Sequence, residues 1–374
     1  MFRRLHFQAV YSRVARVCKN DNGGPHTFKN KWTTFVKARL NCSMPGAYPF
    51  YFDQVQAMSQ VVDTDNDKII YGVFNTPENS ITGSAVCSFR LSDIAESFDG
   101  PLKNQKDANS NWLPLARHEE PVIRPGSCRN NSQSLDDKYL NFIKENALMD
   151  RAVPSTINTP HFIKTSPEER LTTVAVDPRV SVADLSGQAV DVLFIGTTRG
   201  RVIKMASHHD DSGVPRTSVI EEIQVFPVHV AVRNLLVVRG EPGQGRQLVA
   251  LSDHEVKSLP LERCRAHRGC GACVGLQDPY CAWNIQTQTC DRHHSCQVDA
   301  SSLLQNMARG LHPGCGRSSS YSGKLQQNKQ TANSKNTRHV SRARLSGSEP
   351  FELQVETICT GTRYNLWPII EETH

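Results

Sequence analysis

Short apolar segments alternate with polar turn segments along the chain up to about residue 262. Val36, Ala38 and Leu40 alternate with Lys37 and Arg39, which is the period of a half-buried strand. Apolar runs also recur in pairs, and we predict strand pairs for residues 69–74 with 85–89, 191–196 with 201–205, and 248–251 with 256–259. Repeated strand pairs are typical of a sandwich or a propeller, and the pattern alone does not choose between them.

Two segments have the period of a helix instead. Residues 93–98 predict a short helix. Residues 136–149 predict a longer one, which places Leu140, Ile143 and Leu148 near one face. Aspartates at the start of the second segment favour a helix N-terminus there.

Half of the twelve cysteines lie between Cys264 and Cys296. So many thiols in so short a span indicate a disulfide knot or a metal site. Tyr280 and Trp283 would supply the apolar nucleus that a small knot needs, so we expect residues 263–316 to fold alone. Zinc is the alternative, because Cys270-Gly271-Ala272-Cys273 has a ligand-pair spacing. No second pair follows at finger spacing, which favours disulfides.

Composition places the chain among ordinary soluble proteins. Its 374 residues, 38% of them apolar, suffice for one large domain and a small one. The cysteine usage indicates an oxidising compartment. Residues 1–6 are basic, but no apolar run of a secretion signal follows, and no apolar stretch is long enough to span a membrane.

The sequence carries no catalytic motif. It contains neither Gly-x-Ser-x-Gly nor His-Glu-x-x-His, and its glycine-rich segment 240–245 lacks the Lys-Ser/Thr of a phosphate loop. We therefore expect a protein that is not an enzyme and that needs no cofactor. The net charge of +6 is modest, and no aromatic residue interrupts the basic tract 335–344, so we expect no nucleic-acid partner.

Residues 317–374 differ in character from the rest. They begin with Ser318-Ser319-Ser320 and carry only basic charges until Glu349. This composition predicts a disordered basic linker and tail.

Several long motifs resemble one known family. The segment Leu276-Gln277-Asp278-Pro279-Tyr280-Cys281-Ala282-Trp283 is similar to the semaphorin version of the PSI module that plexins, semaphorins and integrins share. Upstream segments resemble signatures of the sema domain, in the same order along the chain: 17–24, 31–42, 83–87 and 124–128. The resemblance covers about residues 9–316, and its details are closest to the invertebrate transmembrane semaphorins.

The resemblance implies an all-β fold with part of a seven-bladed propeller. Residues 1–262 would form the C-terminal part of a sema domain, residues 263–316 a disulfide-rich PSI module, and residues 317–374 a disordered tail. Full sema domains are about twice as long as the upstream part here, so we expect a chain that begins within the propeller.

The resemblance also implies which cysteines pair. It suggests five disulfides and leaves Cys296 and Cys359 without assigned partners. Independently of the family, two sequons make Asn41 and Asn130 candidates for N-glycosylation. The implied pairs are Cys18 with Cys128, Cys42 with Cys87, Cys264 with Cys281, Cys270 with Cys315, and Cys273 with Cys290.

By resemblance, the chain is an extracellular or cell-surface guidance ligand. The family implies binding to a plexin-type receptor, a homodimer through the propeller, and roles in axon guidance and cell migration. The basic tract 335–344 adds heparan sulfate as a possible partner. The alternative from another class is an intracellular zinc-binding or scaffolding protein with reduced cysteines.

Family likeness further predicts where the receptor would bind. Residues 1–100 carry what this chain retains of the receptor surface, including the loop 20–31 and the segment 45–52. Because interface energy concentrates in a few anchors, we expect weak receptor binding, or none, by this chain alone.

Overall fold

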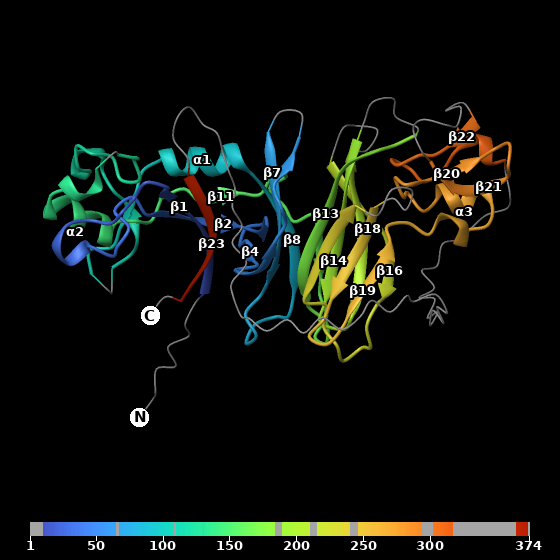
Figure 1. The fold of residues 1–374 in the computed structure, drawn as a ribbon, viewed down its shortest axis with the longest axis horizontal. Helices are drawn as coiled ribbons and strands as arrows, with labels where there is room; N and C mark the ends of the chain where they lie inside the picture. The colour runs from blue at the N-terminus through green and yellow to red at the C-terminus, as the bar shows by residue number, and fades with distance from the viewer. Residues whose placement is uncertain are drawn as a thin grey trace. The chain divides into compact units, whose positions relative to one another are not determined.

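Antiparallel strands are the main secondary structure of the protein in the computed structural model (Figure 1). The structure describes residues 10–64, 67–107, 110–129, 131–183, 189–209, 215–239, 246–293 and 302–316, and the backbone of 364–372. The chain folds as two compact units, residues 1–165 with 347–374, and residues 166–346.

The first unit contains two main sheets and two small strand pairs. One sheet has the strand order β11-β2-β1-β23, and the other has the order β12-β8-β7-β5 with β6 beside β7. The strands of the first sheet are β1 (Val10–Cys18), β2 (Val36–Asn41), β11 (Val153–Pro154) and β23 (Tyr364–Glu372). Those of the second are β5 (Gln54–Met58), β6 (Val62–Asp63), β7 (Lys68–Asn75), β8 (Ser84–Arg90) and β12 (Phe162–Lys164). The small pairs are β3 (Ser43–Met44) with β4 (Phe50–Tyr51), and β9 (Lys103–Asn104) with β10 (Leu113–Pro114).

The predicted strands of this unit are confirmed. In β2 the apolar residues Val36, Ala38 and Leu40 are buried, while Lys37 and Arg39 are half-buried. Strands β7 and β8 pair in antiparallel register from Ile69 with Arg90 to Asn75 with Ser84.

The two predicted helices are also present, but the second is shorter than predicted. Helix α1 (Leu91–Asp99) buries Leu91, Ile94 and Phe98, and helix α2 (Asp137–Glu145) starts at the N-cap Asp136, whose carboxylate accepts from the Tyr139 amide at 2.7 Å. The prediction extended α2 to Met149 and put Leu148 on its apolar face, which is wrong.

Pairing with β2 explains why the helix stops. The Lys37 amide donates to the Ala147 carbonyl at 2.8 Å, and the Met149 amide donates to the Lys37 carbonyl at 2.8 Å. Leu148 thereby lies in a parallel bridge beside Lys37. Ala147 and Met149 thus form backbone hydrogen bonds with β2 instead of the bonds they would form in a longer helix.

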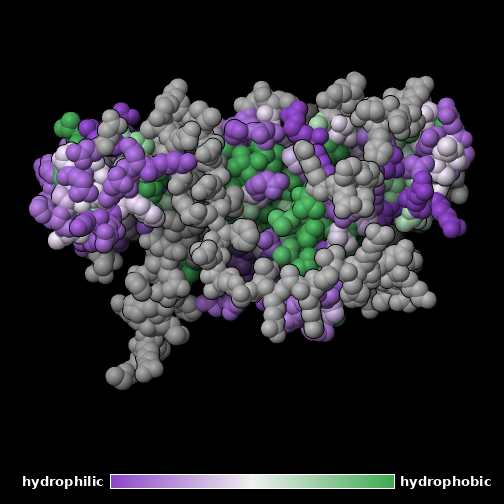
Figure 2. All heavy atoms as spheres, viewed as in Figure 1, coloured by the Kyte–Doolittle hydropathy of each residue, from purple (hydrophilic) through white to green (hydrophobic). Residues whose placement is uncertain are grey.

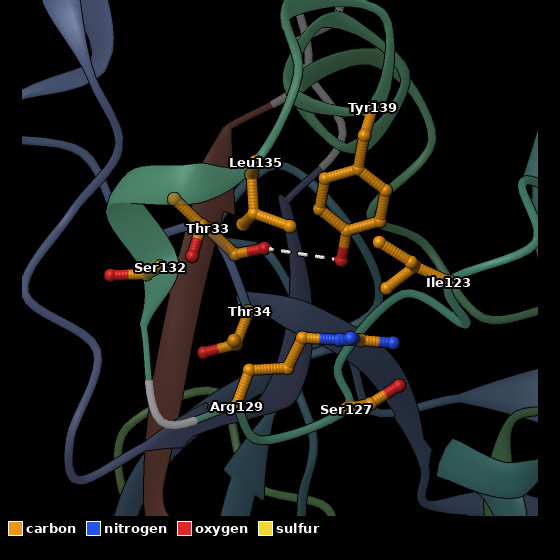
Figure 3. A pocket seen from close by; sticks show the side chains of 8 residues that line it. All are labelled: Thr33, Thr34, Ile123, Ser127, Arg129, Ser132, Leu135 and Tyr139. Atoms are coloured by element: carbon orange, nitrogen blue, oxygen red, sulfur yellow. Dashed lines mark hydrogen bonds between the residues drawn. The ribbon is translucent and has the colours of Figure 1, made fainter.

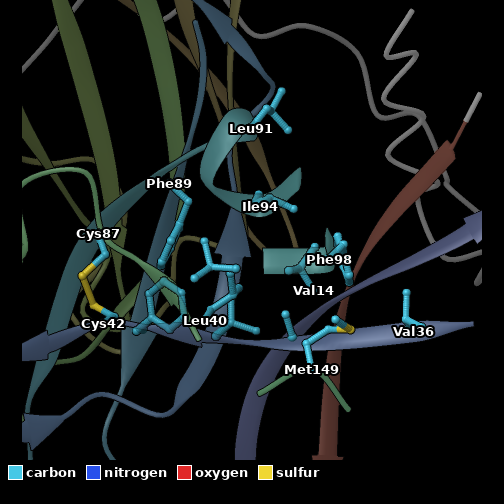
Figure 4. Close-up of a cluster of buried hydrophobic side chains, with 14 of the residues drawn as sticks. Val14, Val36, Leu40, Cys42, Cys87, Phe89, Leu91, Ile94, Phe98 and Met149 are labelled. Carbon is cyan, nitrogen blue, oxygen red and sulfur yellow. A yellow bond between two sulfur atoms is a disulfide. The ribbon is translucent and has the colours of Figure 1, made fainter. Parts of the chain in front are cut away.

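The larger hydrophobic core of the first unit lies between its sheets and α1 (Figure 4). Side chains from β2, from β8 and from one face of α1 meet there. The disulfide between Cys42 and Cys87 lies within this cluster, and both cysteines are buried. It therefore fastens the end of β2 to the middle of β8.

The second unit begins with an antiparallel meander of four strands. Strands β13 (Leu171–Ser181), β14 (Ala189–Thr197), β15 (Arg201–His209) and β16 (Pro215–Gln224) follow each other in space as in sequence. This is the arrangement of a propeller blade. Three further strands form the next sheet: β17 (Asn234–Arg239), β18 (Arg246–Leu251) and β19 (Val256–Pro260). Both predicted hairpins, β14 with β15 and β18 with β19, are therefore confirmed.

The cysteine-rich segment completes the second unit. It contains helix α3 (Cys270–Val274) and the strands β20 (Cys281–Asn284), β21 (Thr289–Arg292) and β22 (Leu303–Leu304), in the order β21-β20-β22. Single 3-10 turns occur at His26–Phe28, Arg117–Glu119, Ser132–Ser134, Cys264–Ala266 and Pro313–Cys315.

The C-terminal tail departs from the prediction at its end. Residues 317–363 lie outside the described residues. Residues Tyr364–Glu372, predicted to be disordered, form strand β23 and pair with all of β1. The sequence Trp367-Pro368-Ile369-Ile370 is locally apolar, and β1 offers a backbone edge on which such a segment can form a strand.

Hydrophilic side chains cover the loop-rich region around α2 on the face shown in Figure 2. No helix among the described residues is long and apolar enough to cross a membrane.

Candidate protein-binding site

Two disulfides brace the first unit. Cys18 is bonded to Cys128 across 110 residues, and Cys42 to Cys87 across 45 residues. In the loop-entropy model each link stabilises the fold by about 4–5 kcal/mol. The cross-links hold the loops that follow β1 and β2 against the rest of the unit.

The loop 20–31 is organised by a single carboxylate. Asp21 accepts hydrogen bonds from the backbone amides of Thr33 and Thr34, each at 2.8 Å, and from the Thr34 hydroxyl at 2.7 Å. It also accepts from the Gly23 amide at 3.0 Å, where the backbone has a positive φ of 79°. A loop fixed in this way is presented in one conformation, which lowers the entropic cost of binding a partner.

A small cavity lies behind this loop (Figure 3). Its volume is about 10 Å³, which is room for one water molecule and for no organic ligand. The Tyr139 hydroxyl points into it and donates to the Thr33 carbonyl at 3.5 Å. Burial raises the pKa of Tyr139 to about 12, so the phenol stays protonated and acts as a donor. The cavity is lined by Thr33, Thr34, Ile123, Ser127, Arg129, Ser132, Leu135 and Tyr139.

The segment 43–51 forms a hairpin that exposes large apolar side chains, and we call it the aromatic hairpin. Ser43 pairs with Tyr51, and Met44 pairs with Phe50. Tyr48 at its tip is 95% exposed, and Met44, Phe50 and Tyr51 are each at least 37% exposed. Such a cluster on a protein surface indicates a site where another protein binds.

Contacts at its base hold the aromatic hairpin in place. The guanidinium carbon of Arg39 lies 4.5 Å from the centre of the Tyr51 ring and 4.6 Å from that of Tyr11. Arg39 also forms an ion pair with Asp53 at 2.7 Å. The Phe50 ring packs edge-on against the buried Phe52 ring, with 5.3 Å between their centres. The exposed aromatic rings are therefore pre-positioned, as the anchors of an interface usually are.

Three disulfides link the cysteine-rich module. They join Cys264 to Cys281, Cys270 to Cys315, and Cys273 to Cys290. With the two upstream bonds, these are the pairs that the family resemblance implies. Because the sulfurs of Cys270 and Cys273 are both bonded to other cysteines, they are not available to bind zinc.

The module shares its core with the two preceding sheets. Trp283 and Tyr280 are buried in the same cluster as Phe226, Leu235 and Leu248. Tyr280 and Trp283 are thus buried as predicted, but their cluster also contains side chains of β17 and β18. Independent folding of residues 263–316 stays a prediction.

Buried polar groups join the module to β13 and β15. The Lys204 ammonium, which is 0% exposed, lies 2.5 Å from an Asp278 carboxylate oxygen that is almost as buried. It also lies 4.7 Å from the centre of the Tyr280 ring. The Tyr280 hydroxyl donates to the Asp177 carboxylate at 2.6 Å. Burial and the nearby Asp177 carboxylate raise the pKa of Tyr280 far above its usual value.

A shallow hollow of about 580 Å³ follows the end of β19. Arg263, Arg265 and Arg292 line it, and each forms an ion pair with a carboxylate, from Glu221, Asp291 and Glu262 respectively. These paired charges leave the hollow without a preference for anions. It is therefore a weaker candidate site than the aromatic hairpin.

The remaining predicted positions are only partly described. Asn41 is the last residue of β2 and is half-buried. Asn130, Cys296, Cys359 and the basic tract 335–344 lie outside the described residues. The glycosylation of Asn41 and Asn130 stays a prediction. Sequence reasoning named the segment of the aromatic hairpin through the family resemblance. It missed the polar contact between Lys204 and Asp278, because residues 74 apart give no local signal.

Comparison with protein families identifies two domains. Residues 54–239 match the model of the Sema domain, and residues 263–316 match that of the Plexin repeat. The chain is 47% identical to Semaphorin-1A of Schistocerca americana over 319 residues, covering 83% of this chain and 43% of that protein. It is 45% identical to Semaphorin-1A of Drosophila melanogaster, covering 82% of this chain and 36% of that protein. The chain thus spans less than half the length of these relatives.

The solved structures that resemble this chain also include semaphorins. The extracellular domains 1–2 of Drosophila Semaphorin 1b are 44% identical, with a TM-score of 0.73 over 80% of this chain and 58% of that one. A structure of Drosophila Plexin A in complex with Semaphorin 1b matches with a TM-score of 0.72 and 44% identity, over 80% of this chain and 59% of that one.

Proposed function

The chain belongs to the semaphorin family, and we propose that it is an extracellular ligand that binds a plexin-type receptor and acts as a dimer in axon guidance and cell migration. The observation that supports this most directly is the likeness to the Semaphorin 1b that was solved with Plexin A, at 44% identity. In this proposal residues 1–262 are the C-terminal part of the sema propeller, residues 263–316 are the PSI module, and residues 317–374 are a linker and tail.

We place the receptor contact on the aromatic hairpin. Exposed aromatic and methionine side chains are enriched at protein interfaces, and a few of them supply most of the binding energy. Tyr51 is stacked on Arg39 at the base, so it presents its ring without a large loss of side-chain entropy, and Tyr48 stands almost fully exposed at the tip. The organised loop 20–31 is the second element of this proposed surface.

Surface plasmon resonance against a plexin ectodomain tests the proposal. We expect binding by the whole chain, and we expect Tyr48→Ala to weaken it at least tenfold, which corresponds to about 1.4 kcal/mol. Val122→Ala is the matched control, since Val122 is a fully exposed apolar residue elsewhere in the same unit. No binding by the unaltered chain at high micromolar receptor would refute the proposed function. If Tyr48→Ala binds the receptor as tightly as Val122→Ala, only the assignment of the contact to the aromatic hairpin is refuted.

Analytical ultracentrifugation tests the proposed dimer. A monomer at all concentrations up to the high micromolar range would count against it.

Binding to immobilised heparan sulfate tests the proposed role of the basic tract. We expect the chain to be retained, and we expect retention to be lost when Arg338, Arg342 and Arg344 are replaced by Ala.

A further inference from the structure

Strand β1 is buried on both of its faces. Ser12, Arg13, Val14 and Ala15 follow one another in sequence, so they point alternately to opposite faces, and all four are at most 7% exposed. A strand in this position cannot satisfy its backbone amides and carbonyls with water. Both of its edges need hydrogen-bond partners.

One edge of β1 is occupied by neighbours that are close in sequence. Residues Arg13 to Arg16 pair with β2. Where β2 ends, the Ser12 amide donates to the Asp53 carbonyl at 3.0 Å, which extends the contact along the chain. The middle of this edge is thus paired without the C-terminal residues.

The other edge is occupied by β23. All nine residues of β1 pair with it in one continuous antiparallel register, from Val10 opposite Glu372 to Cys18 opposite Tyr364. The strand follows a long segment, 317–363, yet it belongs to the same compact unit as β1. The C-terminus of the chain therefore closes the edge of a strand near its N-terminus.

The sequence of β23 is typical of an edge strand. Pro368 lies within it, and proline is confined almost entirely to edge strands because it has no amide hydrogen. Glu371 and Glu372 add charge at one end, which opposes further edge-to-edge pairing. Among the described strands, the sheet order ends at β23.

We propose that the outer edge of β1 is a strand-acceptor site and that its occupant is the C-terminal strand of the same chain. Main-chain hydrogen bonds would bind the segment, as in other cases of strand addition. By filling the edge, β23 blocks association of two copies through β1. This proposal does not depend on plexin binding and concerns a different surface from the aromatic hairpin.

Cysteine cross-linking in the full chain tests the occupant and its register. Ala15 lies directly opposite Trp367, within the reach of a disulfide. In a background with Cys359→Ser, we expect Ala15→Cys with Trp367→Cys to give a cross-link within one chain, found by peptide mass spectrometry. The matched control pairs Ala15→Cys with Glu371→Cys, a same-face position about 13 Å farther along the strand.

Mild oxidation should give at least ten times more cross-link in the first variant than in the control. Equal yields in both variants would refute the fixed register, and a covalent dimer as the main product would refute the assignment to the same chain.

A second variant tests the blocking role. Asn365→Pro with Ile369→Pro, at alternate positions to the native Pro368, should release β23 and raise the oligomer content seen by ultracentrifugation, whereas Asn333→Pro with Ser334→Pro should not. A released variant with unchanged mass and unchanged thermal midpoint would overturn the blocking role.

Discussion

Replacing Asp278 by Asn would test how the PSI module is held to the preceding blade. The substitution keeps the size of the side chain and an oxygen that can accept from the Tyr280 amide, as the carboxylate does at 3.1 Å. It removes the negative charge 2.5 Å from the Lys204 ammonium, where both side chains are at most 3% exposed. The variant therefore leaves a buried cation without its counter-ion.

The expected loss of stability in Asp278→Asn follows from two opposing contributions to the free energy of the ion pair. Taking both charges out of water costs several kcal/mol per ion, and their attraction roughly offsets that cost, so the intact pair adds little net stability. Breaking such a pair by removing one partner typically costs about 3–5 kcal/mol. We expect about 3–5 kcal/mol for Asp278→Asn, because Tyr280 and Lys204 donate to different carboxylate oxygens and the single amide oxygen can accept from only one of them.

A double-mutant cycle separates the pair from its surroundings. Lys204→Met should cost about as much as Asp278→Asn, and the double variant should cost at least about 2 kcal/mol less than the sum. Amide hydrogen exchange, followed by mass spectrometry on peptides from β15 and β20, would measure the local free energies of opening. Asp253→Asn is the control, since its ion pair with Arg233 is exposed on both sides and its loss should leave exchange almost unchanged. A cost below about 1 kcal/mol for Asp278→Asn, or additive single effects, would refute the reasoning.

Two further predictions follow from buried rings. Trp283→Ala removes a core aromatic and should cost about 3–5 kcal/mol, which we expect to prevent recovery of a single disulfide isomer of the module on reversed-phase chromatography. Recovery at the wild-type yield would contradict this. Burial lowers the pKa of His161 from 6.5 to about 4. The unfolded chain therefore binds a proton at a higher pH than the folded one, so stability should fall as pH drops from about 7 to 4, by up to about 3 kcal/mol. His161→Gln should flatten this part of the profile of unfolding midpoint against pH, and an unchanged slope would exclude His161 as its source.

Local patterns sufficed for the elements whose burial is set by their own sequence. The alternation from Val36 to Leu40 and the paired runs of β7, β8, β14 and β15 all predicted strands that the structure contains. In each of these segments the apolar pattern that indicates a strand is complete within a few consecutive residues. The family resemblance, carried by long ordered motifs, then selected a propeller over a sandwich, which periodicity could not do.

Elements that depend on distant partners were predicted less well. Leu148 continues the apolar face of α2 in sequence, but the backbone of β2 competes for the same hydrogen bonds and ends the helix at Glu145. Strand β23 pairs with β1, more than 340 residues earlier in the chain, and nothing near residue 364 in the sequence reveals that partner.

The candidate sites were likewise predicted where local sequence or family motifs indicate them, and missed where they depend on distant residues. The segment 45–52 suggested by the family resemblance overlaps most of the aromatic hairpin, and the structure adds that Tyr48 is the most exposed ring in it. Composition indicated that Tyr280 would be buried, but not that its hydroxyl would reach Asp177, which is 103 residues away.

The nesting of two disulfides has a consequence for biosynthesis. The bond between Cys18 and Cys128 encloses the one between Cys42 and Cys87. A chain that enters an oxidising compartment N-terminus first presents Cys18 and Cys42 to each other before either native partner arrives. At about 5–20 residues per second, the 110 residues between Cys18 and Cys128 take on the order of 5–20 s to synthesise. Pairing in order of appearance would thus give a non-native bond that thiol–disulfide exchange must correct. We therefore expect the yield of natively paired chain to depend more on disulfide isomerase than on the supply of oxidant.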